Sequence, residues 1–167
     1  MDKLKSPTLL DRHHDVNDFD CGVDPLNNFL KNFALVNNQN GSAKTYITTK
    51  AGKVVGYYTI TIGSVNKETT PHRVGKGLAA HPVPVIIIAR FAVDKAHQGH
   101  GIGKAIICDA LLKIVEAADT IGGRAVLVHA KDAQARHFYE KLGFEPSPID
   151  PLHLYLLIKD IKKTFEL

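Results

Sequence analysis

The segment of this 167-residue chain that decides the fold is RFAVDKAHQGHGIGK, residues 90–104. It begins at the end of a nearly continuous apolar run, residues 85–93, which predicts a central strand buried on both faces. A glycine-rich turn follows, and residues 101–118 then repeat apolar side chains at helical spacing. Glycines let a ligand approach the backbone closely, and the first turn of a helix presents unpaired N–H groups with a partial positive charge. The segment therefore predicts an anion-binding turn between a strand and a helix.

Two common phosphate-binding motifs do not fit this turn. A P-loop needs a hydroxyl residue after Gly-Lys, but Ala105 follows Gly103-Lys104, and Gln98 stands where the first glycine belongs. The dinucleotide fingerprint needs its third glycine at position 104, where the chain has lysine. The pattern therefore argues against an NTPase and against a dinucleotide-binding fold.

The rest of the chain supplies the other elements of an α/β fold. Apolar periodicity and turn residues predict two helices and five strands outside the central segment, with a long loop before it. The expected elements are a helix at 25–37, strands at 44–49 and 53–62, a loop at 63–84, a strand at 124–130, a helix at 131–142 capped by Asp132, and a closing strand pair at 144–147 and 152–159. This order places a βαβ crossover at the centre of the second half.

Composition indicates a single globular domain. Apolar residues make up 44% and charged residues 23%, which excludes a disordered or collagen-like chain. No apolar run approaches the length needed to cross a membrane, and the first fifteen residues contain no apolar signal segment. Cys21 and Cys108 are too few for a disulfide framework and indicate free thiols. We therefore expect a cytoplasmic protein without a membrane segment.

Charge is concentrated in the middle of the chain. The net charge is +4, and residues 72–136 hold nine Lys and Arg against five Asp and Glu. Such a local excess attracts anionic ligands, either a phosphorylated cofactor or a nucleic acid, although a solvated basic face explains the charge equally well. The acidic residues between Asp11 and Asp24 predict a region of caps and turns rather than a metal site.

The turn and its surroundings resemble the GCN5-related N-acetyltransferases (GNAT). Residues 98–103, QGHGIG, follow a strand that ends in AVD, and residues 133–144 read AQARHFYEKLGF, which resembles a second family motif. The resemblance extends from about residue 44 to residue 159. It implies a GNAT fold, a central mixed sheet with flanking helices, as one acetyltransferase domain over residues 1–167. It also implies that the turn cradles the pyrophosphate of acetyl-CoA.

The resemblance assigns roles to individual residues. Tyr139 corresponds to the family's general acid, which protonates the departing thiolate of coenzyme A, although a core aromatic at this position is the structural alternative. Backbone groups of the strand end are implied to polarise the acetyl carbonyl, as an oxyanion hole does. The implied cofactor-binding residues are Phe91, Ala92, Val93, Gln98, Gly99, His100, Gly101, Ile102, Gly103, Lys104, Asp132, Ala135 and Phe138.

A narrower resemblance covers nearly the whole chain. The stretches FDCG at 19–22, VGYY at 55–58, LVHA at 127–130 and FEPSP at 144–148 resemble the GNAT toxins of bacterial toxin–antitoxin modules. Members of that group acetylate the α-amino group of the amino acid on charged tRNA and thereby block translation. The resemblance therefore implies aminoacyl-tRNA as substrate, a ribbon-helix-helix antitoxin as partner, and a homodimer.

The residues themselves favour an α-amine acceptor. The strand at 85–93 contains no Asp or Glu that could deprotonate a lysine, whose amine has a pKa near 10.4. An α-amino group, with a pKa of about 7.7–8, is partly neutral at pH 7 without a base. His129, at the end of the next strand, is a candidate base, but a structural histidine is the more common role.

Several basic residues are candidates for tRNA contact, because Lys and Arg bind phosphates. The loop that carries Arg73, Lys76 and His81 is the first choice, and Lys104 is also a candidate for the phosphates of coenzyme A. The substrate candidates are Arg73, Lys76, Arg90 and His129, and the further basic residues are Lys104, Arg124, Lys131 and Arg136.

Two other functions remain open at this stage. A GNAT enzyme could acetylate a small amine or a protein N-terminus, and a basic module could bind nucleic acid without chemistry. The intact turn and Tyr139 argue against the second. A metal site at His13-His14 and a covalent acetyl-enzyme at Cys21 are both disfavoured, since direct attack by an amine needs neither.

Overall fold

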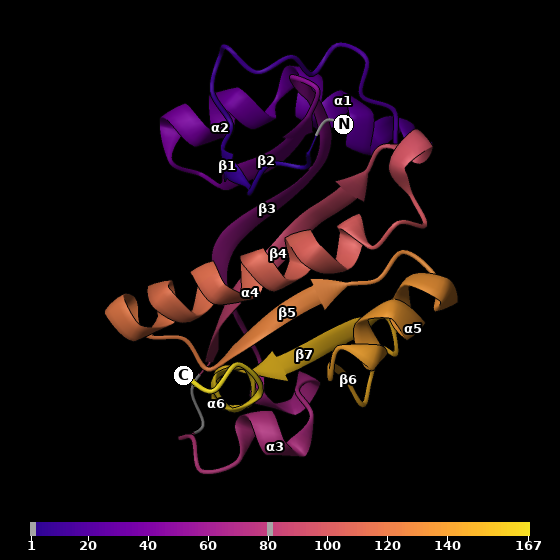
Figure 1. Cartoon of the computed structure of the whole chain (residues 1–167). Helices are drawn as coiled ribbons and strands as arrows, with labels where there is room; N and C mark the ends of the chain where they lie inside the picture. Colours follow the sequence, from indigo (N-terminus) through magenta and orange to yellow (C-terminus); the bar gives the residue numbers. More distant parts are fainter. Residues whose placement is uncertain (1–2, 80–81) are drawn as a thin grey trace. The chain divides into compact units, whose positions relative to one another are not determined.

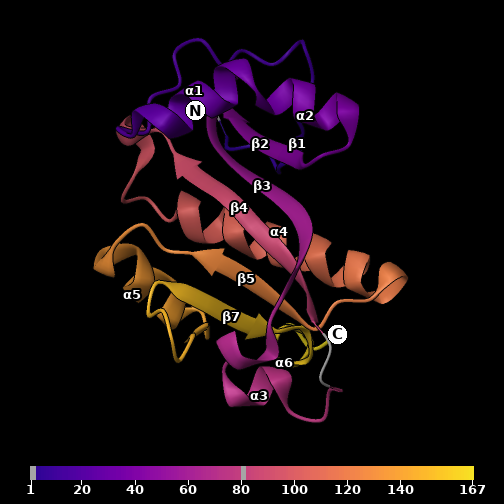
Figure 2. The same cartoon turned by 180° about the vertical axis from the view of Figure 1, so that it is seen from behind.

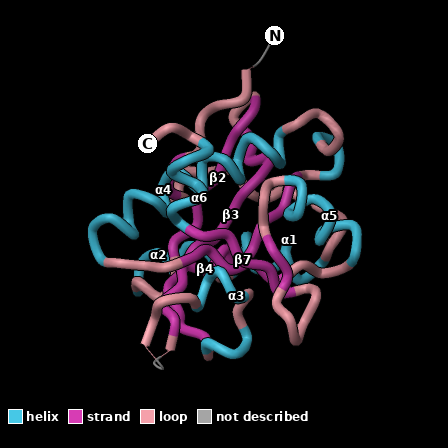
Figure 3. Tube along the Cα trace, turned by 90° about the horizontal axis from the view of Figure 1, so that it is seen from below, coloured by secondary structure: helices cyan, strands magenta, loops and turns pink. Residues whose placement is uncertain are grey.

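A computed structural model describes residues 3–79 and 82–167 of the chain. Figure 1 labels its helices and strands, and Figure 3 separates helices, strands and loops by colour. In chain order, the strands and α-helices are β1 (Thr8–Leu9), α1 (Asp24–Asn32), α2 (Ala34–Asn40), β2 (Lys44–Lys50), β3 (Lys53–Val65), α3 (His72–Gly75), β4 (Val83–Val93), α4 (Ile102–Ile121), β5 (Ala125–His129), α5 (Ala133–Lys141), β6 (Glu145–Pro146), β7 (His153–Leu157) and α6 (Ile158–Thr164).

The strands form a mixed sheet in the order β1-β2-β3-β4-β5-β7-β6. Strands β4 and β5 are parallel, with Val85 opposite Ala125 and Ile88 opposite Val128. The described pairs at both ends of the sheet are antiparallel. Because a parallel pair needs a crossover, β4, α4 and β5 form the predicted βαβ unit. The predicted α/β class with a mixed sheet and flanking helices is confirmed.

Contacts divide the chain into two compact units. The first contains residues 1–61 and 89–110, and the second contains residues 62–88 and 111–167. The division passes through β3, β4 and α4, so each unit combines segments that are far apart in the sequence. The predicted cofactor turn belongs to the first unit, and Tyr139 belongs to the second.

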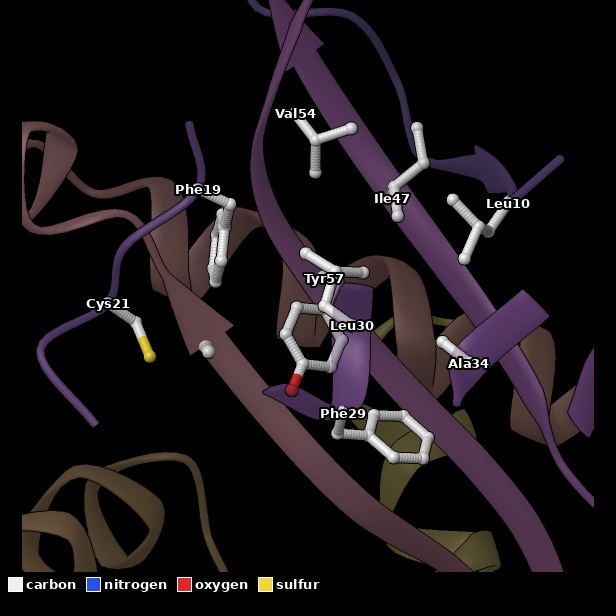
Figure 4. Packing of buried hydrophobic residues seen from close by; sticks show 10 residues of the cluster. Leu10, Phe19, Cys21, Phe29, Leu30, Ala34, Ile47, Val54 and Tyr57 are labelled. Carbon is white, nitrogen blue, oxygen red and sulfur yellow. The ribbon is translucent and has the colours of Figure 1, made fainter. Parts of the chain in front are cut away.

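The core of the first unit is aromatic and centres on Tyr57. Its ring lies 5.7 Å from that of Phe19 and 6.3 Å from that of Phe29, measured between centroids. Figure 4 shows these rings among Leu30, Ile47 and other buried side chains. The cluster joins α1, β2, β3 and the segment before α1 into one packed body.

The predicted helix at 25–37 is two helices. Phe33 leaves the helical conformation, with φ −126°, and its exposed side chain separates α1 from α2. The change of direction lets Asn38 of α2 turn inward, where its amide bonds to the backbone of Leu10 and Thr45. The apolar periodicity continues across the break, so the pattern did not reveal it.

The core of the second unit lies around β5 and β7, which are side by side in both views (Figures 1 and 2). It includes Val83, Val85, Leu127, Tyr155 and Leu157. The predicted loop at 63–84 is partly wrong here. Strand β3 continues to Val65 with alternating burial, and the loop then forms a 3₁₀ turn at Lys67–Thr69 and the short helix α3.

Three other features differ from the predictions. Strand β7 ends at Leu157 and the helix α6 follows, whereas a strand was expected to Lys159. The short strand β1 was not predicted. The expectation that β4 is buried on both faces fails near its end, where Ala89 is exposed and Arg90 and Phe91 are half-buried. Within the described part of the chain, no helix is long and apolar enough to cross a membrane.

Candidate active site

The glycine-rich turn begins with a capped 3₁₀ helix. The Asp94 carboxylate accepts a hydrogen bond of 2.9 Å from the Ala96 N–H. Gly99 and Gly101 then adopt φ values of +81° and +79°, which side-chain-bearing residues rarely adopt. A Cβ at either position would meet nothing within 4 Å, so the requirement for glycine is conformational rather than steric. The backbone can therefore turn directly into α4.

The strand end packs against this turn. A Cβ built on Gly103 would lie 3.2 Å from the Phe91 ring and 3.8 Å from a Val93 methyl group. Ala92 and Val93 are buried, and Ile102 is buried in the first turn of α4. The structure thus brings together the strand residues 91–93 and the glycine turn, as the sequence predicts.

The side chain of Gln98 holds the turn from within. Its amide Nε2 donates to the Val93 carbonyl at 2.9 Å and to the Cys21 carbonyl at 3.3 Å. His100 Nδ1 lies 3.4 Å from the His97 carbonyl, and Lys104 is exposed on α4. The side-chain amide of Gln98 is thus engaged with the protein backbone, which leaves the backbone amides as the donors of this turn.

These groups fit a pyrophosphate. Helix α4 runs for 20 residues, and the N–H groups of its first turn have no partner within the helix. Two glycines without side chains stand in front of them, and the exposed Lys104 adds a positive charge. A diphosphate is bound well by this combination of amide donors, helix dipole and cation.

Arg90 has an unusual environment in the first unit. Its guanidinium carbon lies 3.8 Å from the centre of the Phe29 ring, a cation–π contact. Among residues 3–79 and 82–167, no carboxylate forms a salt bridge with it. A half-buried guanidinium in contact with a ring has restricted freedom, which favours binding of a phosphate or carbonyl by its N–H donors.

Tyr139 has a buried ring on α5, in the second unit. Its relative exposure is 7%, and Phe138 and Phe144 pack edge-on at 5.3 Å and 5.5 Å between centroids. Burial raises the pKa of Tyr139 to about 12. Among the described residues, no hydrogen bond ends on its hydroxyl and no buried side-chain oxygen lacks a partner, so the hydroxyl is accessible. It is a protonated donor at physiological pH.

Asp132, Ala135 and Phe138 shape the helix that carries this tyrosine. The Asp132 carboxylate accepts a bond of 2.8 Å from the Ala135 N–H and caps the start of α5, as predicted. Phe138 packs on Tyr139. In this structure Asp132 and Ala135 form the cap of α5, and Phe138 contacts the tyrosine ring.

His129 stacks on His153, its partner in the β5–β7 pairing. The ring centroids are 4.0 Å apart and nearly parallel, and His153 Nε2 lies 3.4 Å from an Asp150 oxygen. Partial burial, and next the neighbouring His153, lower the pKa of His129. His129 is therefore a neutral imidazole at pH 7.

The basic residues predicted around Arg73 are engaged in the protein's own contacts. Arg73 forms ion pairs with Glu145 at 2.8 Å and Asp160 at 3.0 Å. Arg124 donates to the backbone carbonyls of Arg73, Val74 and Lys76. The first choice for tRNA contact is therefore weakened, since these two charges are partly satisfied.

Other basic candidates differ in how far their charge is engaged. Arg136 pairs with Glu140 on α5, while Lys76 and Lys131 are exposed. His81 lies outside the described residues.

The acidic segment near the N-terminus forms turns, as predicted. The carboxylates of Asp11, Asp15 and Asp20 each accept an N–H two residues further along the chain. His14 Nδ1 accepts the Asp11 N–H. Cys21 is buried, and its thiol lies 3.6 Å from the Val23 carbonyl. Within residues 3–79 and 82–167, no three metal-ligating side chains are grouped.

The sequence analysis missed the residues that hold the turn. Asp20 and Asn27 connect α1 and its preceding loop to residues 94–98. Lys95, together with the Gly22 N–H and Asn27, lowers the pKa of the Asp20 carboxyl. Their signal was weak, because the stretch FDCG carries no spacing that indicates a partner about 75 residues away.

Comparisons with known proteins agree with this geometry. The Acetyltransferase (GNAT) domain family matches residues 41–146. A protein of Mycobacterium tuberculosis (strain ATCC 25618 / H37Rv), named a tRNA-acetylating toxin, is 42% identical over 162 residues, which are 97% of each chain.

Two solved structures are similar over nearly their whole length. AtaT complexed with acetyl-methionyl-tRNAfMet is 26% identical, with a TM-score of 0.89 over 98% of this chain and 99% of that one. A mutant AtaT toxin bound to the C-terminus of the antitoxin AtaR and acetyl-CoA is 27% identical, with a TM-score of 0.83 over 99% and 100%.

Proposed function

The chain belongs to the GNAT acetyltransferase family, and from this we propose that it is a toxin that acetylates the α-amino group of aminoacyl-tRNA. The observation that carries the proposal is the 42% identity, over 97% of both chains, to a tRNA-acetylating toxin. The structural likeness to AtaT complexed with acetyl-methionyl-tRNAfMet supports it. Acetylation removes the basicity of the amine that must attack in peptide-bond formation, so translation stops.

Acetyl-CoA is the acetyl donor and supplies a thioester, whose carbonyl an amine can attack directly. The backbone amides between Gly99 and Lys104 bind its pyrophosphate in this proposal, supported by the left-handed glycines and the start of α4. Backbone groups of Phe91, Ala92 and Val93 orient the acetyl carbonyl. The β4–β5 pairing described above ends at Ile88, three residues before Phe91, which leaves backbone groups for this role.

Tyr139 supplies the proton that the reaction needs. The neutral α-amine forms a bond to the carbonyl carbon, the carbon–sulfur bond breaks, and the phenol protonates the thiolate while the new ammonium loses its proton. A phenol whose pKa is raised to about 12 stays protonated in the cell and remains a donor. The neutral His129 is available as proton acceptor, supported by its lowered pKa.

Arg90 is proposed to contact the tRNA. Its guanidinium is oriented by Phe29 and has no salt bridge within the described residues, in contrast to Arg73. In the second unit, the exposed Lys76 is a further candidate for contact with a tRNA phosphate.

The resemblance also supports proposals on assembly. We propose a homodimer and a ribbon-helix-helix antitoxin as partner, the latter supported by the likeness to an AtaT bound to the C-terminus of AtaR. Residues 1–167 would act as one acetyltransferase domain, since the family match includes parts of both compact units. A charged-tRNA substrate places the activity in the cytoplasm.

The test is acetyl transfer from radiolabelled acetyl-CoA to a pool of aminoacylated tRNA, with uncharged tRNA as control. We expect label only on charged tRNA, in a form released when the aminoacyl ester is hydrolysed. Label on a small amine or a protein N-terminus but not on tRNA would contradict the toxin function while leaving an acetyltransferase. Binding of RNA without acetyl-CoA binding would contradict the enzyme itself.

A further inference from the structure

The loop at residues 20–22 lies against the turn that is proposed to bind acetyl-CoA. Asp20 contacts this turn with three different groups. Its N–H donates to the Asp94 carboxylate at 3.1 Å, its carbonyl accepts the Lys95 N–H at 2.8 Å, and its carboxylate pairs with the Lys95 ammonium at 2.9 Å. The neighbouring Cys21 carbonyl accepts the Gln98 side chain at 3.3 Å. Four contacts therefore join a three-residue loop to a five-residue segment of the turn.

Helix α1 fixes the loop from its other side. The Asn27 side chain donates to the Asp20 carboxylate and accepts the Cys21 N–H, both at 2.9 Å. Asp20 also accepts the N–H of Gly22, at 2.9 Å. The loop is thus clamped between α1 and the turn, and Phe19 and Cys21, on either side of Asp20, point into the aromatic core (Figure 4).

These contacts bind the segment that immediately precedes the two left-handed glycines of the turn. Asp94, Lys95 and Gln98 precede Gly99 and Gly101, whose conformational freedom would otherwise let the backbone amides adopt many directions. Amide donors bind an anion well only when their orientation is fixed beforehand, because ordering them on binding costs entropy. Fixing residues 94–98 therefore fixes the starting position of the backbone segment that carries the amide donors after Gln98.

We propose that Asp20 and Asn27 are positioning residues that hold the glycine turn in its acetyl-CoA-binding conformation. This inference rests on the proposed function, because it concerns the affinity for the same acetyl donor. Neither side chain is placed on the donor; both act through Asp94, Lys95 and Gln98. We call the loop at 20–22, together with Asn27 of α1, the brace.

The direction in which the affinity for acetyl-CoA changes in Asp20→Asn distinguishes the brace from a purely electrostatic effect. Asp20 carries a negative charge beside a turn proposed to bind polyanionic coenzyme A, so charge alone predicts that its neutralisation tightens binding. The brace predicts the opposite, since Asp20→Asn loses the ion pair with Lys95 and weakens the hydrogen bonds to a carboxylate. Asn27→Ala removes the connection to α1 without any change in charge.

The experiment measures the Kd of acetyl-CoA by calorimetry and the kcat for charged-tRNA acetylation at saturating donor. We expect Asp20→Asn and Asn27→Ala each to raise the Kd about tenfold, with kcat within about twofold of the wild type. Asp18→Asn is the matched control, because Asp18 forms its exposed salt bridge with Lys53 rather than with a residue of the turn, and the Kd of this variant should remain that of the wild type. Thermal unfolding of each variant identifies folded protein.

Other outcomes would overturn the inference. An unchanged Kd in Asp20→Asn would show that Asp20 has no effect on binding of the donor. A lower Kd would show that Asp20 acts on the donor only through its negative charge. An equal increase in the Kd of Asp18→Asn would show a general effect of removing a negative charge. If Asn27→Ala binds the donor normally while Asp20→Asn does not, α1 has no part in the brace. Failure of the wild type to bind acetyl-CoA would contradict the proposed function itself. If the wild type binds acetyl-CoA and both variants bind it with the same Kd, only the brace is contradicted.

Discussion

Tyr139 combines two properties that a general acid needs. Its ring is almost fully buried between Phe138 and Phe144, which fixes its direction, while its hydroxyl remains accessible. The same burial raises its pKa to about 12, so the proton is present throughout the pH range in which α-amines become neutral.

Removal of that hydroxyl tests the role. We expect Tyr139→Phe to lower kcat by about 100-fold or more, while the Kd of acetyl-CoA stays within about twofold, because only proton transfer is lost. Tyr155→Phe, the same change at a buried tyrosine in the core of the second unit, is the control. Steady-state kinetics with charged tRNA measure both. A Tyr139→Phe enzyme with wild-type kcat would remove the residue from the mechanism.

His129 makes stability depend on pH. Burial and His153 lower its pKa below the usual 6.5, so between the two values the unfolded chain binds more protons than the folded one. Stability should therefore decrease as the pH falls through about 6.5, and the decrease should level off below the pKa of the folded state.

Urea unfolding at pH 7.5, 6.5 and 5.5 measures this dependence. We expect His129→Gln to lose less stability than the wild type over that interval, because the group responsible for the difference in proton binding is absent. His137→Gln, at an exposed histidine on α5, is the matched control. Equal slopes for His129→Gln and wild type would show that His129 is not the source.

At the scale of elements, short segments here depend on contacts distant in sequence. Helix α3 has only four residues, far fewer than an isolated helix needs. Arg124, immediately before β5, donates to the backbone carbonyls of Arg73 and Val74 in α3 and of Lys76 just after it. Val74 adds a side chain that is 1% exposed in the second core. The helix is therefore stabilised by tertiary contacts rather than by its own sequence.

Arg124→Met keeps the aliphatic stem and removes these three bonds. We expect a loss of about 2 kcal/mol in the free energy of unfolding, since three backbone carbonyls, one of them in a partly buried hydrogen bond, lose a charged donor. Arg136→Met, which breaks only an i,i+4 pair with Glu140 on α5, should cost about 0.5 kcal/mol. Urea denaturation of both variants measures the difference. Equal costs would mean that Arg124 contributes no more than a surface ion pair.

The whole molecule carries a net charge of +4, with its excess in residues 72–136. The structure qualifies this excess, because Arg73, Arg124 and Arg136 are engaged with carboxylates or carbonyls. The charge that remains for a polyanion in this part of the chain is that of Arg90 and of the exposed Lys76, Lys104 and Lys131. A tRNA substrate should therefore depend on few phosphate contacts.

Salt dependence tests this at the scale of the whole protein. With three phosphate contacts, kcat/KM for charged tRNA should fall at least about tenfold between 50 and 200 mM salt. A small α-amine acceptor without phosphates should show little change under the same conditions. Rates measured with both acceptors at saturating acetyl-CoA separate the two cases. A flat profile for charged tRNA would contradict phosphate contacts as the basis of recognition.

The sequence alone determined the class of fold and the chemistry of the turn. The glycines at 99 and 101 and the apolar strand before them are local requirements, since backbone conformation and helix initiation depend on neighbouring residues. The cap at Asp132 was predictable for the same reason. The family motifs at 98–103 and 133–144 then indicated acetyl-CoA and Tyr139.

Only the tertiary structure decided which candidate charges are engaged and what holds the turn. Arg73 looks like a free cation in a loop, yet Glu145 and Asp160, more than 70 residues away, pair with it. Asp20 looks like a turn residue, yet it bonds to Lys95. Such contacts join segments whose separation in sequence carries no period, so local patterns cannot reveal them. They depend on the packing that brings distant segments of each unit together.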